Sequence, residues 1–150
     1  MQKAALILEG GALRAFFTIG VLDQMMLDNF NFEYVNGVSA GALSGVNYIS
    51  HQRKRSYRID SNFLHNKNYI GLRNVFLSDG FFNIDFVFGK TVADFFPFDE
   101  TAYRNSKQIF EVNATNLVTG RSDFFRKIPK NNLYHEIKAS ASLPLLARIQ

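Results

Sequence analysis

The first fifty residues alternate between extended segments and segments in which apolar or small residues recur at helical spacing. Residues 4–8 form a continuous apolar run, and residues 33–36 form a shorter extended segment, so both are predicted to be strands. Residues 15–29 carry apolar side chains close to the helical period, and residues 40–49 are rich in the small residues that let a helix approach a sheet. The pattern therefore predicts two successive strand–turn–helix units.

The remaining hundred residues begin with a central insertion, after which strands and a helix of the same domain follow. Residues 50–68 are polar and basic, and residues 69–98 are rich in phenylalanine, so we expect loops and short helices there. Strand character returns at residues 108–114 and 122–125, and residues 131–142 are predicted to form the last helix. No repeat, linker or low-complexity tract divides the chain, which favours a single domain.

The turn between the second strand and its helix has the sequence Gly37-Val38-Ser39-Ala40-Gly41. This G-x-S-x-G pattern is that of a nucleophile elbow, in which a sharp turn strains the serine backbone and exposes its hydroxyl. Gly37 and Gly41 would clear space beside the neighbouring strand and helix, and the N–H of Ala40 would point toward a carbonyl under attack. The alternative is an ordinary glycine-rich turn.

The turn after the first strand, Gly10-Gly11-Ala12-Leu13-Arg14, also opens a helix. Backbone amides at such a turn can stabilise a phosphate or a tetrahedral oxyanion. A dinucleotide-binding turn would have glycine at positions 12 and 15, where this chain has alanine, and no P-loop motif is present. Arg14 could fix the loop or be solvated, and the turn could simply join a strand to a helix. Together the two turns supply a nucleophile and an oxyanion site, which indicates a serine hydrolase.

The two turns and two later segments resemble, in the same order, the N-terminal half of a bacterial patatin-like phospholipase. The later segments are 112–120, similar to the family's inner strand and turn, and 138–144, similar to its Ala-Ser-x-x-x-Pro segment. The resemblance covers nearly the whole chain. It implies an α/β fold of three layers, α/β/α, with a mainly parallel central sheet. It also implies a Ser–Asp dyad without histidine, which acts on an acyl ester of a lipid.

Carried over residue by residue, the resemblance assigns Ser39 as the nucleophile. It assigns Gly10, Gly11 and Ala12, with Arg14 beside them, to the loop that forms the oxyanion hole. Family members usually have a glycine where Ala12 stands. Alanine keeps the N–H donor if its backbone angles suit a residue with a Cβ atom.

The sequence departs from the family pattern at its C-terminal end. The family's aspartate is expected in an Asp-Gly-Gly or Asp-Gly-Ala motif shortly after the Ala-Ser-x-x-x-Pro segment, but the sequence ends at Gln150, close to Pro144. The sole Asp-Gly pair, Asp79-Gly80, comes too early and is typical of a tight turn. We therefore expect residues 1–150 to be the N-terminal part of the domain, a fragment or naturally shortened form without the base of the dyad.

Composition agrees with a soluble globular domain. A chain of 150 residues that is 47% hydrophobic can bury a core, and no apolar run approaches the ~18 residues of a membrane span. The absence of cysteine excludes disulfides and thiolate metal sites, and no signal-peptide pattern precedes the first strand. We expect a cytoplasmic protein, with peripheral contact to a membrane, that uses no cofactor or metal ion.

A basic cluster bears on the partners of this chain, whose net charge is +4: it consists of Arg53, Lys54, Arg55 and Arg58. The cluster could meet anionic lipid headgroups, each charge contributing about 1 kcal/mol near such a surface, or it could be a solvated helix face. No recognition motif accompanies the charge, which argues against nucleic acid as a partner.

The second half of the insertion contains many phenylalanines. They could line an acyl-chain pocket or dip into a membrane interface, although most large aromatic side chains belong to a core. The residues concerned are Phe76, Phe81, Phe82, Phe86, Phe88, Phe95, Phe96 and Phe98.

Two other functions remain alternatives. A Ser–His–Asp triad needs the order serine, acid, histidine. His51 and His65 follow the serine too closely, whereas His135 has four candidate acids before it, namely Asp85, Asp94, Asp99 and Asp123. The other alternative is a non-catalytic binding module that keeps the fold and its basic and aromatic surface for a lipid or a partner protein.

Overall fold

A computed structural model of the chain describes residues 1–69, 83–126 and 133–142. Within these ranges the description leaves out four side chains, those of Ile84, Phe88, Lys90 and Thr91. The Asp79-Gly80 pair, Pro144 and three of the phenylalanines, Phe76, Phe81 and Phe82, lie outside the described residues.

The described residues build a four-stranded sheet with the strand order β1-β2-β3-β4. The first three strands are parallel and the last is antiparallel to its neighbour. The strands are β1 (Gln2–Leu8), β2 (Phe32–Val38), β3 (Ile109–Thr115) and β4 (Ser122–Arg126). The predicted α/β class and mainly parallel sheet are confirmed.

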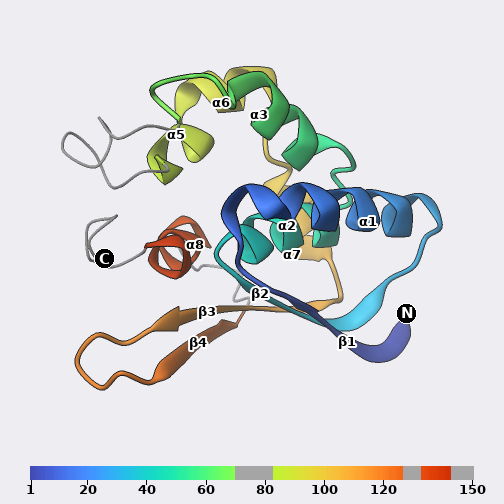
Figure 1. Ribbon diagram of the computed structural model, residues 1–150. Helices are drawn as coiled ribbons and strands as arrows, with labels where there is room; N and C mark the ends of the chain where they lie inside the picture. The colour runs from blue at the N-terminus through green and yellow to red at the C-terminus, as the bar shows by residue number, and fades with distance from the viewer. Residues whose placement is uncertain (70–82, 127–132, 143–150) are drawn as a thin grey trace.

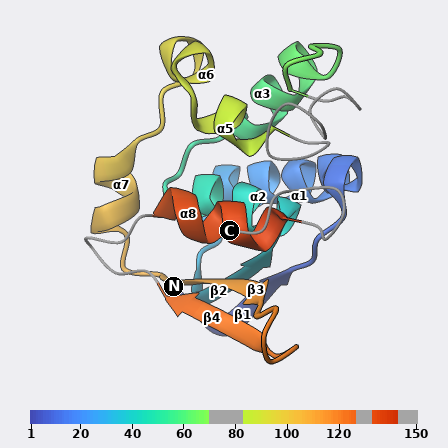
Figure 2. The ribbon, with the colours of Figure 1, turned by 90° about the vertical axis from the view of Figure 1, so that its left-hand side faces the viewer.

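All described helices lie on one face of the sheet (Figures 1 and 2). The helices nearest the sheet are α1 (Ala15–Leu27), α2 (Ala40–Ile49), α7 (Glu100–Asn105) and α8 (Leu133–Ala141). The opposite face carries exposed Ile7 and Phe124. The described residues thus form two of the three expected layers, one sheet and one layer of helices.

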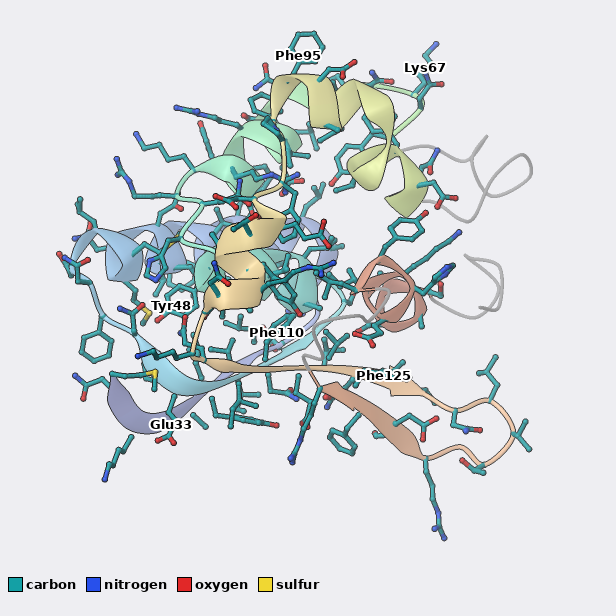
Figure 3. The ribbon with its side chains drawn as sticks, turned by 180° about the vertical axis from the view of Figure 1, so that it is seen from behind. Glu33, Tyr48, Lys67, Phe95, Phe110 and Phe125 are labelled. Carbon is teal, nitrogen blue, oxygen red and sulfur yellow. The ribbon has the colours of Figure 1, made fainter. Side chains whose placement is uncertain are left out.

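Alternation along the strands explains which face is covered. Val35 on β2 and Phe110 and Val112 on β3 point toward the helices and are fully buried. They pack against Val46 and Ile49 of α2, and Figure 3 shows Phe110 between this helix and the sheet. The core therefore sits between α2 and the two central strands.

The uncovered face of the sheet also holds a polar network centred on Glu111. Glu111 is buried, accepts a short hydrogen bond from the Tyr34 hydroxyl, and accepts from Asn36 Nδ2 at 3.2 Å and Arg126 Nε at 2.8 Å. Burial raises the pKa of Glu111, but the bonds from Tyr34 and Arg126 outweigh burial and hold the pKa below its ordinary value. The network ties β2, β3 and β4 together.

The insertion folds into three described helices: α3 (Arg55–Phe63), α5 (Ile84–Phe88) and α6 (Lys90–Phe95). They enclose a second apolar cluster around Ile59, Val87 and Val92, against which Phe86 and Phe96 pack. Several of the phenylalanines therefore serve this small core. Phe98 packs against the main core instead, and Phe95 is 70% exposed and points away from the molecule (Figure 3).

The basic cluster is not a continuous surface, because Arg55 is buried. Its Nη1 donates to Asn47 Oδ1 at 3.0 Å, its Nε donates to the Phe96 carbonyl at 3.0 Å, and its guanidinium lies over the Phe98 ring. Burial lowers the pKa of Arg55 to about 10. Arg55 therefore joins α2 to the insertion, and the exposed members of the cluster are Arg53, Lys54 and Arg58.

Candidate functional site

The C-terminal ends of the three parallel strands meet at one edge of the sheet. Leu8 of β1 pairs with Gly37 of β2, and Val38 pairs with Asn113 of β3. The segments that leave these strands therefore emerge side by side, and this edge is where open α/β sheets bind ligands. Both glycine-containing turns singled out in the sequence lie here.

Ser39 follows β2 directly and has φ 53° and ψ −119°. This conformation is disfavoured for a residue with a Cβ atom and persists only where the surroundings enforce it. The Ser39 carbonyl accepts from the N–H groups of Ala42 and Leu43, at 2.9 and 3.1 Å, in the first turn of α2. Its own N–H donates to Ser140 Oγ at 2.8 Å. The serine therefore has the strained backbone expected of an elbow.

Close approach of α2 to the sheet explains the two flanking glycines. A Cβ atom on Gly37 would lie 2.7 Å from the Ala42 backbone, and one on Gly41 would lie 2.3 Å from the Leu8 carbonyl oxygen. Neither position has room for a side chain, because the obstacles are backbone atoms. The segment for which an elbow is expected, Gly37, Ser39, Ala40 and Gly41, thus forms a sharp strand-to-helix turn.

The glycine loop after β1 lies beside the serine. A Cβ atom on Gly10 would be 3.3 Å from Ser39 Cβ. The chain then forms a 3₁₀ turn, η1 (Ala12–Arg14), in which Ala12 has φ 48°. Arg14 folds back over Gly11, since a Cβ atom there would meet its Nε at 3.1 Å. Arg14 therefore covers the loop with its guanidinium.

Backbone amides without a backbone acceptor among the described residues line the same cavity as Ser39. Within the described residues, the N–H groups of Gly10, Gly11 and Ala12 make no backbone hydrogen bond. The N–H of Ala40 belongs to the first turn of α2, where amides have no intrahelical acceptor. No acidic side chain lies in the first turn of α1 or α2, so the positive ends of both helices are unopposed there.

A cavity of about 910 Å³ opens in front of these donors. Ser39, the glycine loop and Ser140 form part of its wall. Its apolar wall includes Leu43, Val46, Ile59 and Val87, which come from α2 and the insertion. Phe125 of β4 also lines it, whereas no described phenylalanine of residues 76–98 does. An apolar cavity of this size beside a nucleophile suits a hydrocarbon chain.

Two carboxylates line the cavity, and both have partners. Asp60 accepts from the Tyr69 hydroxyl at 2.6 Å, and Asp123 accepts from Asn116 Nδ2 at 3.0 Å. Burial raises the pKa of Asp60, and the bond from Tyr69 partly opposes this shift. Burial and the neighbouring Asp60 carboxylate raise the pKa of Tyr69. Neither carboxylate is hydrogen-bonded to the serine.

The structure does not bring a triad together from the described residues. Ser39 Oγ has no hydrogen bond to any of them, and His51, His65 and His135 are exposed and do not line the cavity. The acids before His135 in the sequence have other positions. Asp85 accepts from Lys138, Asp99 caps α7 through the Ala102 N–H, and neither lines the cavity.

Ser140 was not identified as a site residue by sequence reasoning. The Ala-Ser-x-x-x-Pro segment marked its position, but its contact with the Ser39 amide joins residues 101 positions apart. No local pattern encodes such a contact. The segment's likeness to a family motif was the available signal, and it gave no role for the hydroxyl.

The described residues contain no group of three or more His, Cys, Asp and Glu side chains placed to hold a metal ion. Among the described helices, none combines the length and apolar character needed to cross a membrane.

The mainly parallel sheet with helices packed on it defines an α/β protein, with a strained serine after its second strand. Comparison with protein families narrows this class. The model of the Patatin-like phospholipase family matches residues 6–150. The chain belongs to this family, whose members are lipid acyl hydrolases. No curated protein sequence matches it.

Proposed function

We propose that this protein hydrolyses acyl esters of lipids with Ser39 as the nucleophile. The observation that carries the proposal is the strained Ser39 backbone lying against Gly10, at the wall of an apolar cavity. An intrinsically costly conformation at a cavity wall is typical of a reacting residue. The family membership supports a lipid ester as the substrate class.

In the proposed reaction, Ser39 Oγ bonds to the ester carbonyl carbon and its proton passes to a base. The N–H groups of Gly11, Ala12 and Ala40 stabilise the negative charge on the former carbonyl oxygen. The bond to the alcohol oxygen then breaks, the alcohol leaves with the proton, and water hydrolyses the acyl-serine ester. The apolar wall holds the acyl chain.

We propose that the base is the aspartate of the Asp-Gly motif that the family resemblance implies downstream of Pro144. The support is that Ser39 Oγ has no partner within the described residues and that Asp60 and Asp123 are engaged elsewhere. Asp60→Asn and Asp123→Asn should each retain most activity in a protein that carries this motif. A loss in either variant as large as that of Ser39→Ala would place the base inside this chain.

A fluorophosphonate probe tests the nucleophile. The probe should label Ser39, and Ser39→Ala should abolish both labelling and hydrolysis of a short-chain ester. His135→Ala serves as the control, because its exposed side chain lies away from the cavity and the variant should remain active. Labelling of Ser39→Ala at the original rate would refute the assignment, and inactivity of His135→Ala would favour a triad.

Exposed aliphatic side chains at the cavity suggest that it opens toward a membrane surface. Leu13 in η1 is 42% exposed, and Leu117 and Val118 in the β3–β4 hairpin are 53% and 96% exposed. All three line the cavity. In Val118→Asp, less protein should co-sediment with phospholipid vesicles, whereas turnover of a soluble ester should be retained. Unchanged vesicle binding would refute this orientation.

A further inference from the structure

The hydroxyl of Ser140, which lines the same cavity, contacts the backbone of the proposed nucleophile. Ser39 N–H donates to Ser140 Oγ at 2.8 Å, across 101 residues of sequence. Ser142, two residues later in the same segment, differs in its bonding. Its hydroxyl donates to the Lys138 carbonyl at 2.8 Å, within its own chain segment. Of these two serines, Ser140 alone reaches across to the elbow.

The helix that carries Ser140 is firmly attached. Ile137 of α8 is fully buried in the main core. Lys138 donates to both carboxylate oxygens of Asp85 at 3.1 Å, which joins α8 to α5, and its ammonium group lies near the Tyr134 ring. Because these contacts fix α8, the Ser140 oxygen is a fixed acceptor for the elbow.

The position of the bond matters for the strained backbone of Ser39. The angle ψ is set on the carbonyl side, where Ala42 and Leu43 donate to the Ser39 oxygen. The angle φ is set on the amide side, where the Ser39 N–H donates to Ser140 Oγ, its acceptor within the described residues. The two sets of bonds hold the Ser39 residue from both sides. Without the Ser140 bond, the amide could rotate toward a lower-energy conformation.

We infer that Ser140 is a positioning residue for Ser39: its oxygen holds the Ser39 amide so that the hydroxyl stays in the reactive orientation. The inference rests on the proposed function of Ser39. Ser140 acts through Ser39 and not on the substrate, so it should affect the chemical step more than substrate binding. A group that fixes the orientation of a reacting residue typically contributes 10- to 100-fold to rate.

Kinetics of a protein that carries the proposed Asp-Gly motif test this inference. Ser140→Ala should lower kcat about 10- to 100-fold with little change in KM, and it should slow fluorophosphonate labelling of Ser39 to a similar extent. Ser140→Thr keeps the hydroxyl and should restore most of kcat. Ser142→Ala is the matched control and should leave both rates unchanged, because within the described residues its hydroxyl bonds to Lys138 of its own segment.

Amide exchange gives a measurement independent of activity. In Ser140→Ala, the Ser39 amide should exchange with solvent faster than in the original protein, while the amides in the core of α2 keep their protection. If Ser140→Ala does not fold, Ser140→Cys replaces it, since the thiol is similar in size but a weaker acceptor, and intermediate effects are expected. Unchanged kcat and unchanged exchange at Ser39 would overturn the inference. Activity in Ser39→Ala would overturn the proposed function itself.

Discussion

Two residues with left-handed backbone angles follow the C-terminal ends of neighbouring strands. Ser39 has φ 53° after β2, and Ala12 has φ 48° in the loop after β1. Both carry a Cβ atom, for which this region is unfavourable by about 1–2 kcal/mol. The strain at Ser39 is explained if this residue is the nucleophile proposed above. The strain at Ala12 arises because alanine occupies a position where a glycine would adopt the same angle freely.

Ala12→Gly should therefore raise the free energy of unfolding by up to about 1 kcal/mol, since the relieved strain exceeds the added entropy of the unfolded chain. Activity should be retained, because the N–H donor is unchanged. Urea unfolding measures the difference. Ala93→Gly, at an exposed position of helix α6, is the control and should lower stability by about 0.5–1 kcal/mol. A loss of stability in Ala12→Gly would contradict the strain assigned to Ala12.

At the scale of elements, the close packing of α2 against β1 requires that Gly41 has no side chain. Gly41→Ala would place a Cβ atom 2.3 Å from the Leu8 carbonyl oxygen, so the helix must shift. We expect a loss of about 1–3 kcal/mol of stability and a large loss of esterase activity, because the shift moves Ser39.

Gly20→Ala is the matched comparison for this helix variant. A Cβ atom on Gly20 meets nothing within 4 Å, and the residue lies in the middle of α1. This change should raise the free energy of unfolding by about 0.5–1 kcal/mol and leave activity unchanged. Equal stability of the two alanine variants would show that Gly41 is not sterically required.

The polar network on the open face of the sheet predicts a dependence of stability on pH. The pKa of Glu111 is below its ordinary value in the folded protein. Its contribution is therefore complete at neutral pH and is lost as the pH falls from about 4.5 through the folded-state pKa. In Glu111→Gln, the free energy of unfolding should fall less steeply as the pH decreases over this acid range. In Tyr34→Phe, the slope should be reduced to a smaller extent. An unchanged slope in Glu111→Gln would contradict the network.

The sequence predicts helices and strands well where the hydrophobic periodicity and the turn-forming residues indicate the same boundaries. The helices at residues 15–27 and 40–49 and the strands at 109–115 and 122–126 all match their predicted segments closely. Both glycine-containing turns were also located correctly between a strand and a helical segment, because glycine spacing is local information. Pairing across the chain was not predictable. Arg55 resembled a surface charge in a basic run, and only the tertiary fold shows that carbonyl groups and Asn47 surround it.

For the whole molecule, the location of the base decides how active residues 1–150 can be. A positioned general base typically contributes 10²–10⁴-fold to rate. The 150-residue chain should therefore hydrolyse a short-chain ester at least about 100-fold more slowly than a version extended through a downstream Asp-Gly motif. Comparable turnover by both, abolished in each by Ser39→Ala, would show that residues 1–150 already contain a base.

The parallel pairing of β2 with β3 also sets an order of events during synthesis. Residues 39–108 separate these neighbouring strands, so β1, β2 and the first two helices leave the ribosome well before β3 does. At typical translation rates this interval lasts roughly 4–14 s. Ribosome-bound chains that stop before residue 109 should be cut readily by protease, and chains that extend past β4 should resist it. Throughout that interval the outer edge of β2 is open to other chains, which makes it the most vulnerable surface of the nascent protein.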